Sequence, residues 1–135
     1  MKATVKWDGD LSFTGTTESG YTMVMDGAGK AVSPMESVLV AAGACSSVDV
    51  VEILKKGRFD IHDVRCELDA DRAAEPPRVF TRLHAHYVVT GSGLTEKAVA
   101  RAVNLSAEKY CSVMLMLEKS VDVSTSFELV DAPAK

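Results

Sequence analysis

The sequence predicts an α+β fold in which mainly antiparallel strands are organised around one long helix. Three short segments near the start, residues 2–7, 11–14 and 21–25, alternate apolar and polar side chains as half-buried strands do. A much longer apolar segment, residues 33–56, follows them. Strands and helices then come in runs and do not alternate one by one, which is typical of α+β proteins.

The long helix has sequence features that define both of its ends. Ser33 and Glu36 have the spacing of a capping box, and Pro34 stands at the first helical position. Two lysines precede Gly57, and they suit the negative end of a helix dipole. We therefore predict one continuous helix over residues 33–56.

This helix is apolar on nearly all sides, so we predict that it is buried on all sides. One small domain can hardly cover such a helix. We therefore expect a homodimer with the helix near the two-fold axis, where Gly43 and its neighbouring alanines permit close contact. Glu36, Asp49 and Glu52 interrupt the apolar pattern, so we do not expect a membrane span.

The second half of the chain predicts two strands, two helices and a last strand. Pro76 and Pro77 mark the turn between the two strands, while Thr95 and Ser112 are suitable N-caps for the two helices. The predicted segments are strands at 64–71 and 79–89, helices at 95–109 and 113–119, and a strand at 121–129.

Length and composition predict one soluble domain over residues 1–135. The net charge of −4 gives no electrostatic basis for nucleic-acid binding. The first residues lack the apolar segment of a signal peptide, so we expect a cytoplasmic protein. The chain has three cysteines, an odd number, and we do not expect permanent disulfides in a cytoplasmic protein. The cysteines are therefore expected to be free, and any of them could be a reactive thiol.

Two of the three thiols have settings in which chemistry is plausible. Cys45 lies mid-helix among serines, with Asp49 one turn away; a carboxylate there would raise the thiol pKa, and a cation would be needed to offset it. Cys111 stands at the start of a helix, where a thiol pKa is usually lowered. Either could instead be a buried packing residue. Cys66, on the apolar face of a strand, is predicted to be core.

His84 and His86 point the same way on one predicted strand, which is a possible metal pair. No third or fourth ligand is evident in the sequence. We therefore expect a solvated strand surface, and neither a metal nor another cofactor.

Two motifs, SPMESVLVAAGACSSVDVVEILKK at residues 33–56 and SAEKYCSV at residues 106–113, resemble the OsmC/Ohr family of thiol-dependent hydroperoxide reductases, most of all its YhfA-like branch. The resemblance implies an intertwined homodimer with two active sites at the subunit interface. It also implies that Cys45 attacks the peroxide and becomes a sulfenic acid, which Cys111 resolves to a disulfide. An external dithiol would then reduce the pair, without metal, haem or flavin.

The sequence departs from the hydroperoxidase branches of that family at two places. Those branches carry a glutamate directly after the proline that opens the cysteine helix, whereas here Met35 takes that position and Glu36 follows. They also carry an arginine in the N-terminal strands, and no arginine precedes residue 58 here. Lys30 is a candidate replacement cation, as are Arg78 and Arg82.

Two functions remain open at this point. The paired cysteines favour a hydroperoxide reductase. The apolar surroundings of Cys45 favour organic hydroperoxides over hydrogen peroxide as its substrates, because binding there would bury hydrocarbon. The missing arginine and the displaced glutamate favour a non-enzymatic dimer that responds to redox state or binds a small ligand. A cation near Cys45 would distinguish the two.

Overall fold

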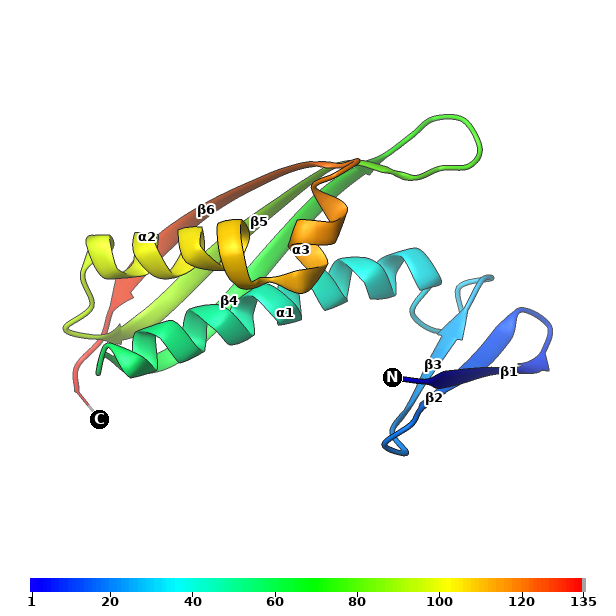
Figure 1. Cartoon of the computed structure of the whole chain (residues 1–135), viewed down its shortest axis with the longest axis horizontal. Helices are drawn as coiled ribbons and strands as arrows, with labels where there is room; N and C mark the ends of the chain where they lie inside the picture. The colour runs from blue at the N-terminus through cyan, green and yellow to red at the C-terminus, as the bar shows by residue number, and fades with distance from the viewer. Residues whose placement is uncertain (135) are drawn as a thin grey trace. The chain divides into compact units, whose positions relative to one another are not determined.

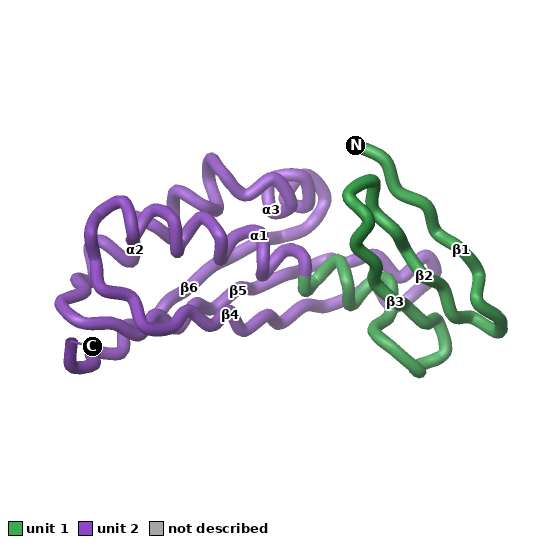
Figure 2. The backbone as a smooth tube through the Cα atoms, turned by 90° about the horizontal axis from the view of Figure 1, so that it is seen from below, with its two compact units in different colours: residues 1–40 green, residues 41–135 purple. Residues whose placement is uncertain are grey.

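The computed structural model describes residues 1–134, and the chain divides into two compact units, residues 1–40 and the remainder from residue 41 (Figure 2). The predicted order of elements is confirmed, and the fold is α+β with one long helix. The elements are β1 (Ala3–Gly9), β2 (Ser12–Thr17), β3 (Thr22–Asp26), α1 (Pro34–Lys56), β4 (Asp60–Arg72), β5 (Phe80–Ser92), α2 (Glu96–Leu105), the π-helical turn η1 (Ser106–Tyr110), α3 (Ser112–Leu117) and β6 (Asp122–Asp131).

The first unit is an antiparallel meander in the order β1-β2-β3. Lys6 pairs with Thr14 across the first hairpin, and Phe13 pairs with Met25 across the second. The first turn contains Asp10 at a φ of 46°, a left-handed conformation that aspartate tolerates better than most residues. The alternating pattern of the sequence thus predicted all three strands.

The first unit also contains the start of α1, where the predicted capping box is confirmed. The Glu36 N–H donates to Ser33 Oγ over 3.0 Å, and the Ser33 N–H donates to Glu36 Oε1 over 2.9 Å. The hydrogen bond from the Ser33 N–H, followed by the Ser33 side chain, lowers the pKa of the Glu36 carboxyl. The helix therefore begins where the local sequence predicts it.

The second unit is a three-stranded sheet in the order β4-β5-β6. Strands β4 and β5 form the expected antiparallel hairpin, but β6 runs parallel to β5, with His84 opposite Ser124 and Tyr87 opposite Phe127. The prediction of mainly antiparallel pairing is therefore wrong for this last pair. Parallel neighbours need a long crossover connection, which α2, η1 and α3 supply.

Helices α1 and α2 cover one face of this sheet, with α2 against β6 (Figure 1). Within the second unit α1 buries only its inner stripe, and Val48 on its outer side is 56 % exposed. The predicted burial of α1 on all sides is thus not found within the chain. The core that the helices and the sheet share contains Val50, Leu54, Leu83, Tyr87, Val89, Val99 and Val103.

By length and composition alone, α1 could cross a membrane. The core helix of a soluble protein passes the same test, and buried residues such as Val50 and Leu54 place the inner stripe of α1 in the core of the second unit. The apolar character of α1 is therefore accounted for by packing on its inner side only.

Gly43 lies on the buried side of α1, against the side chain of Leu68 on β4. A Cβ added at Gly43 would lie 2.5 Å from Leu68 Cδ1. The glycine thus permits a close approach within the chain, whereas the sequence suggested a contact between two helices of a dimer at this position. Gly43 therefore packs against β4 of its own chain, and the expected homodimer stays a prediction.

We expect Gly91→Ala to destabilise the protein far more than Gly43→Ala. At Gly91, on β5, a new Cβ would overlap the backbone carbonyl oxygen of Asp60, which cannot move without breaking the β4–β5 pairing, so the cost should be about 2–3 kcal/mol. At Gly43 the obstacle is a mobile methyl group, and better helix propensity returns about 1 kcal/mol. Urea unfolding of both variants measures the difference, and equal losses would contradict this packing.

Candidate active site

Cys45 and Cys111 come together in the second unit of the fold. Cys45 lies in the middle of α1 and is half-buried, whereas Cys111 lies between η1 and α3 and is completely buried. Cys45 lies close enough to Cys111 to raise the pKa of the Cys111 thiol. The fold therefore joins two thiols that are far apart in the sequence.

Cys111 is held by hydrogen bonds on both sides. Its N–H donates to the carbonyl oxygen of Ser106 over 2.8 Å, which closes the π-helical turn. Its Sγ accepts from the N–H of Met114 at 3.4 Å, so Cys111 itself is the N-cap of α3. The predicted cap, Ser112, is instead the first residue of the helix, and the predicted helix 95–109 ends as an α-helix at Leu105.

Burial raises the pKa of the Cys111 thiol to about 12. The neighbouring Cys45 and the negative charge of Asp49 contribute smaller parts of this rise, and the Met114 N–H acts against it. The lowered pKa predicted from a helix N-terminus is therefore wrong, because the loss of solvation outweighs one amide hydrogen bond. Cys111 is a protonated thiol at neutral pH.

We expect Asp49→Asn to lower the pKa of Cys111, but by only a small part of the rise, because Asp49 is the weakest of its causes. A carboxylate disfavours a thiolate nearby, and the amide removes that charge while leaving burial, the largest cause, unchanged. The pH dependence of Cys111 alkylation measures the shift, with Cys45→Ser and Cys66→Ser added to isolate the signal. An unchanged or raised pKa would contradict the influence of Asp49.

A buried hydrogen-bond network surrounds the pair. Ser106 Oγ donates to the carbonyl oxygen of Ser46 at 3.1 Å and to Asp49 Oδ2 at 3.0 Å. From the sheet, the Tyr87 hydroxyl donates to Ser46 Oγ at 2.6 Å, and Ser46 Oγ in turn donates to the Ala42 carbonyl. This network ties the Cys45 turn of α1 to β5 and to the turn that precedes Cys111.

Sequence reasoning missed Tyr87 and Ser106. Tyr87 had a detectable signal, because it carries the only hydroxyl group among Leu83, Ala85, Tyr87 and Val89 on the buried side of β5. A buried tyrosine usually has a hydrogen-bond partner, and here it is Ser46. Ser106 had none, because a serine before a helix break is common.

The third thiol, Cys66, lies on β4 and is half-buried. Burial raises its pKa, while hydrogen bonds with Tyr87 and Ser47 act in the opposite direction. Cys66 is thus a neighbour of the network through Tyr87 and Ser47.

The candidate cations of the sequence are engaged in other contacts. Lys30 Nζ lies 3.2 Å from Asp10 Oδ2 in the first unit, and both side chains are well exposed. Arg82 forms ion pairs with Asp71 at 2.7 Å and with Asp69 at 3.2 Å. Arg78 donates from Nε to a backbone carbonyl on the β4–β5 connection. The structure thus assigns other partners to all three.

The sequence profile of the OsmC-like protein family matches residues 27–126. The chain belongs to the OsmC family. Protein YhfA of Escherichia coli K12 is 54 % identical over 134 residues, which cover 98 % of this chain and 100 % of YhfA. This membership confirms the family resemblance that the two cysteine motifs indicated.

Solved structures agree with this OsmC-family assignment. A hypothetical protein from Aquifex aeolicus is 32 % identical and aligns with a TM-score of 0.90 over 98 % of this chain and 97 % of its own. The organic hydroperoxide resistance protein OhrB of Bacillus subtilis shares the fold, with a TM-score of 0.62 at 17 % identity over 94 % of this chain and 96 % of OhrB. A hydroperoxide-resistance protein thus shares the fold of this chain.

The OsmC-family chain also carries a polar ladder on the outer face of its sheet. His84 hydrogen-bonds to Ser124 and Ser126, and His86 to Ser126 and Glu128, all at 2.7–2.9 Å. Among residues 1–134, no three histidine, cysteine or acidic side chains are grouped as a metal ion would require. The histidine pair therefore forms a hydrogen-bonded surface.

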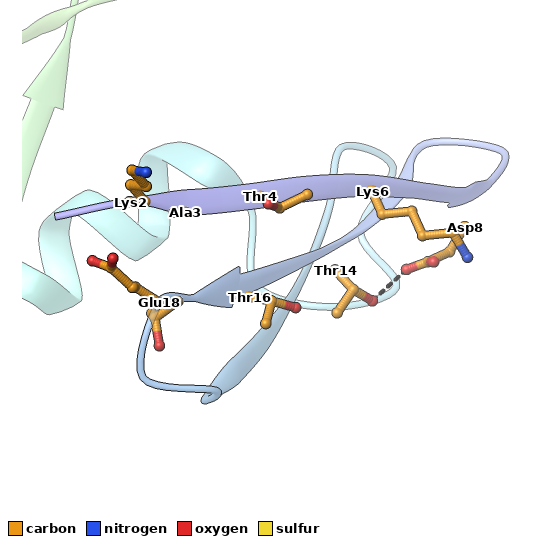
Figure 3. Close-up of a pocket in the computed structure, with 9 residues that line it drawn as sticks. Lys2, Ala3, Thr4, Lys6, Asp8, Thr14, Thr16 and Glu18 are labelled. Carbon is orange, nitrogen blue, oxygen red and sulfur yellow. Dashed lines mark hydrogen bonds between the residues drawn. The ribbon is translucent and has the colours of Figure 1, made fainter.

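Two hollows flank different parts of the molecule. One, of about 420 Å³, lies between α1 and α2 and includes Asp49, Arg101 and Tyr110 in its lining. The other, of about 490 Å³, lies on β1 and β2 of the first unit, where Figure 3 shows Lys2, Lys6 and the Thr14–Asp8 hydrogen bond. Only the first adjoins the thiol network, through Asp49.

Proposed function

We propose that this OsmC-family protein reduces organic hydroperoxides, with Cys45 as the peroxidatic and Cys111 as the resolving cysteine. The juxtaposition of these two thiols carries the proposal. Their burial supports the division of roles, because the half-buried Cys45 is reachable by a substrate and the buried Cys111 is reachable chiefly by Cys45.

The chemistry proceeds in three balanced steps. The Cys45 thiolate attacks the outer oxygen of the hydroperoxide, the O–O bond breaks, and the alkoxide leaves and takes a proton to become an alcohol. Cys111 then attacks the sulfenic acid of Cys45, forming the disulfide and releasing water. An external dithiol reduces that disulfide by two thiol exchanges, which restores both thiols.

We propose further that the protein acts as a cytoplasmic homodimer and needs no cofactor. Within the second unit, exposed apolar residues of α1 such as Val48 suit coverage by another subunit. Such a partner would also reduce the access of water to Cys45. The chemistry is a two-electron reaction at sulfur, which the thiols can perform alone.

Steady-state turnover tests the proposed function. The reduced protein is mixed with tert-butyl hydroperoxide and dithiothreitol as the external dithiol, and peroxide loss is followed. We expect saturable consumption that exceeds the rate with hydrogen peroxide, because hydrocarbon binding contributes about 25 cal/mol per Å² of buried apolar area. A rate equal to that of dithiothreitol alone would refute the proposal, and equal rates with both peroxides would refute the substrate preference.

One observation favours a second candidate function, a non-enzymatic dimer that responds to redox state or binds a small ligand. The neighbouring groups that raise the pKa of Cys111 include another thiol and a carboxylate, and such an environment does not activate a thiol. For this candidate, disulfide formation would be slow and would alter dimerisation or ligand binding without peroxide turnover. The turnover assay distinguishes the two.

A further inference from the structure

Ser106 hydrogen-bonds both to the Cys45 turn of α1 and to Cys111 itself. It is completely buried. Its hydroxyl reaches the Ser46 carbonyl at 3.1 Å and Asp49 Oδ2 at 3.0 Å, both on α1. Its own carbonyl accepts the N–H of Cys111 at 2.8 Å. The two hydroxyl contacts connect Ser106 to the Cys45 segment of α1, and the carbonyl contact connects it to Cys111.

The π-helical turn explains why this connection is possible. In an α-helix the N–H of residue 111 would bond to residue 107, but here it bonds to Ser106, five residues earlier. The wider turn brings the Ser106 hydroxyl onto α1 while Cys111 leaves the helix to cap α3. Short π-helical segments often occur at functional sites.

We propose that Ser106 is a positioning residue that holds the Cys111 thiol against Cys45, so that the Cys45 sulfenic acid is resolved before a second peroxide oxidises it. The inference rests on the proposed function. It names a residue that determines whether the Cys45 sulfenic acid forms the disulfide or is oxidised further. The hydrogen bonds of Ser106 go to the Ser46 carbonyl, to the Asp49 carboxylate and from the Cys111 N–H.

Two reactions compete for the sulfenic acid. In the first, Cys111 attacks the Cys45 sulfur, the S–O bond breaks, an S–S bond forms and water leaves. In the second, another hydroperoxide transfers an oxygen atom to the same sulfur, which gives a sulfinic acid and an alcohol. The first is intramolecular, so its rate depends steeply on the position of Cys111, and a displacement of about 1 Å can cost about a hundredfold.

The test measures this partition in Ser106→Ala, with Ser106→Thr to restore the hydroxyl. Reduced proteins receive graded tert-butyl hydroperoxide, and mass spectrometry quantifies the Cys45–Cys111 disulfide and the Cys45 sulfinic acid. We expect Ser106→Ala to raise the ratio of sulfinic acid to disulfide at least about tenfold. Ser106→Thr should recover most of the wild-type ratio.

Thr95→Ala is the matched control for general loss of stability. Thr95 caps α2 through a hydrogen bond from the Ala98 N–H at 3.1 Å, and its hydroxyl makes no bond to the thiol network. It should lower thermal stability while keeping the wild-type ratio of products. A wild-type ratio in Ser106→Ala, or an equal rise in Thr95→Ala, would overturn the positioning role.

A second measurement does not depend on peroxide chemistry. The dithiol–disulfide equilibrium of the wild type and of Ser106→Ala is titrated in mixtures of reduced and oxidised dithiothreitol. We expect the Ser106→Ala disulfide to be at least about tenfold easier to reduce, and an unchanged equilibrium would overturn the inference. A wild type that equilibrates normally but does not react with peroxide would instead refute the proposed function alone.

Discussion

Replacing Cys45 by serine is expected to slow peroxide-driven thiol oxidation at least about a thousandfold, which corresponds to roughly 4 kcal/mol of activation free energy. A serine hydroxyl does not undergo the two-electron oxidation that a thiolate does. The remaining thiols cannot substitute, because burial raises the pKa values of both Cys66 and Cys111. Stopped-flow measurement of thiol loss with tert-butyl hydroperoxide gives the rate.

The control is Cys66→Ser, which removes a half-buried thiol without touching the proposed pair. It should retain the wild-type rate within about twofold, because Cys66 has no step in the proposed chemistry. If Cys45→Ser kept a rate comparable with that of Cys66→Ser, another residue would be the site of attack. The assignment of Cys45 would then be wrong.

Replacing Cys111 by serine should separate the two halves of the reaction. The first oxidation should proceed at the wild-type rate, but the sulfenic acid should persist and react with dimedone, which traps that species. We expect steady-state turnover with dithiothreitol to fall about a hundredfold, because the buried intramolecular thiol has been lost. Mass spectrometry of the trapped Cys45 peptide provides the measurement.

The accumulation of Cys45 sulfinic acid in Cys111→Ser provides a second readout. Without a resolving thiol, excess hydroperoxide should convert most of the protein to that form within the time that the wild type needs to form its disulfide. A Cys111→Ser protein that cycles at the wild-type rate would show that the external dithiol resolves Cys45 directly. Cys111 would then have a structural role.

Local sequence patterns predicted most of the fold because the responsible interactions are local. The capping box of Ser33 and Glu36 marked the start of α1, and alternating side chains marked each strand. The parallel pairing of β5 with β6 was missed, since it depends on how three helical segments cross the sheet. No local pattern carries that information.

The sequence pointed to the two thiols of the candidate site but not to their electrostatics, and the supporting candidates Lys30 and Glu36 lie in the first unit. The motifs identified Cys45 and Cys111, and the structure brings them together. The pKa of Cys111 was predicted in the wrong direction, because helix position is visible in a sequence and burial is not. Ser106 was missed for a related reason, because its role depends on a π-helical turn that no residue preference announces.

The most direct test of the account compares the three thiols within one molecule. Reduced protein receives less than one equivalent of tert-butyl hydroperoxide, and isotope-coded alkylation reports each cysteine over time. We expect Cys45 and Cys111 to lose reactivity together and to appear as one disulfide-linked peptide pair, while Cys66 stays reduced. Comparable loss at all three cysteines, with no linked peptide, would contradict the proposed dithiol site.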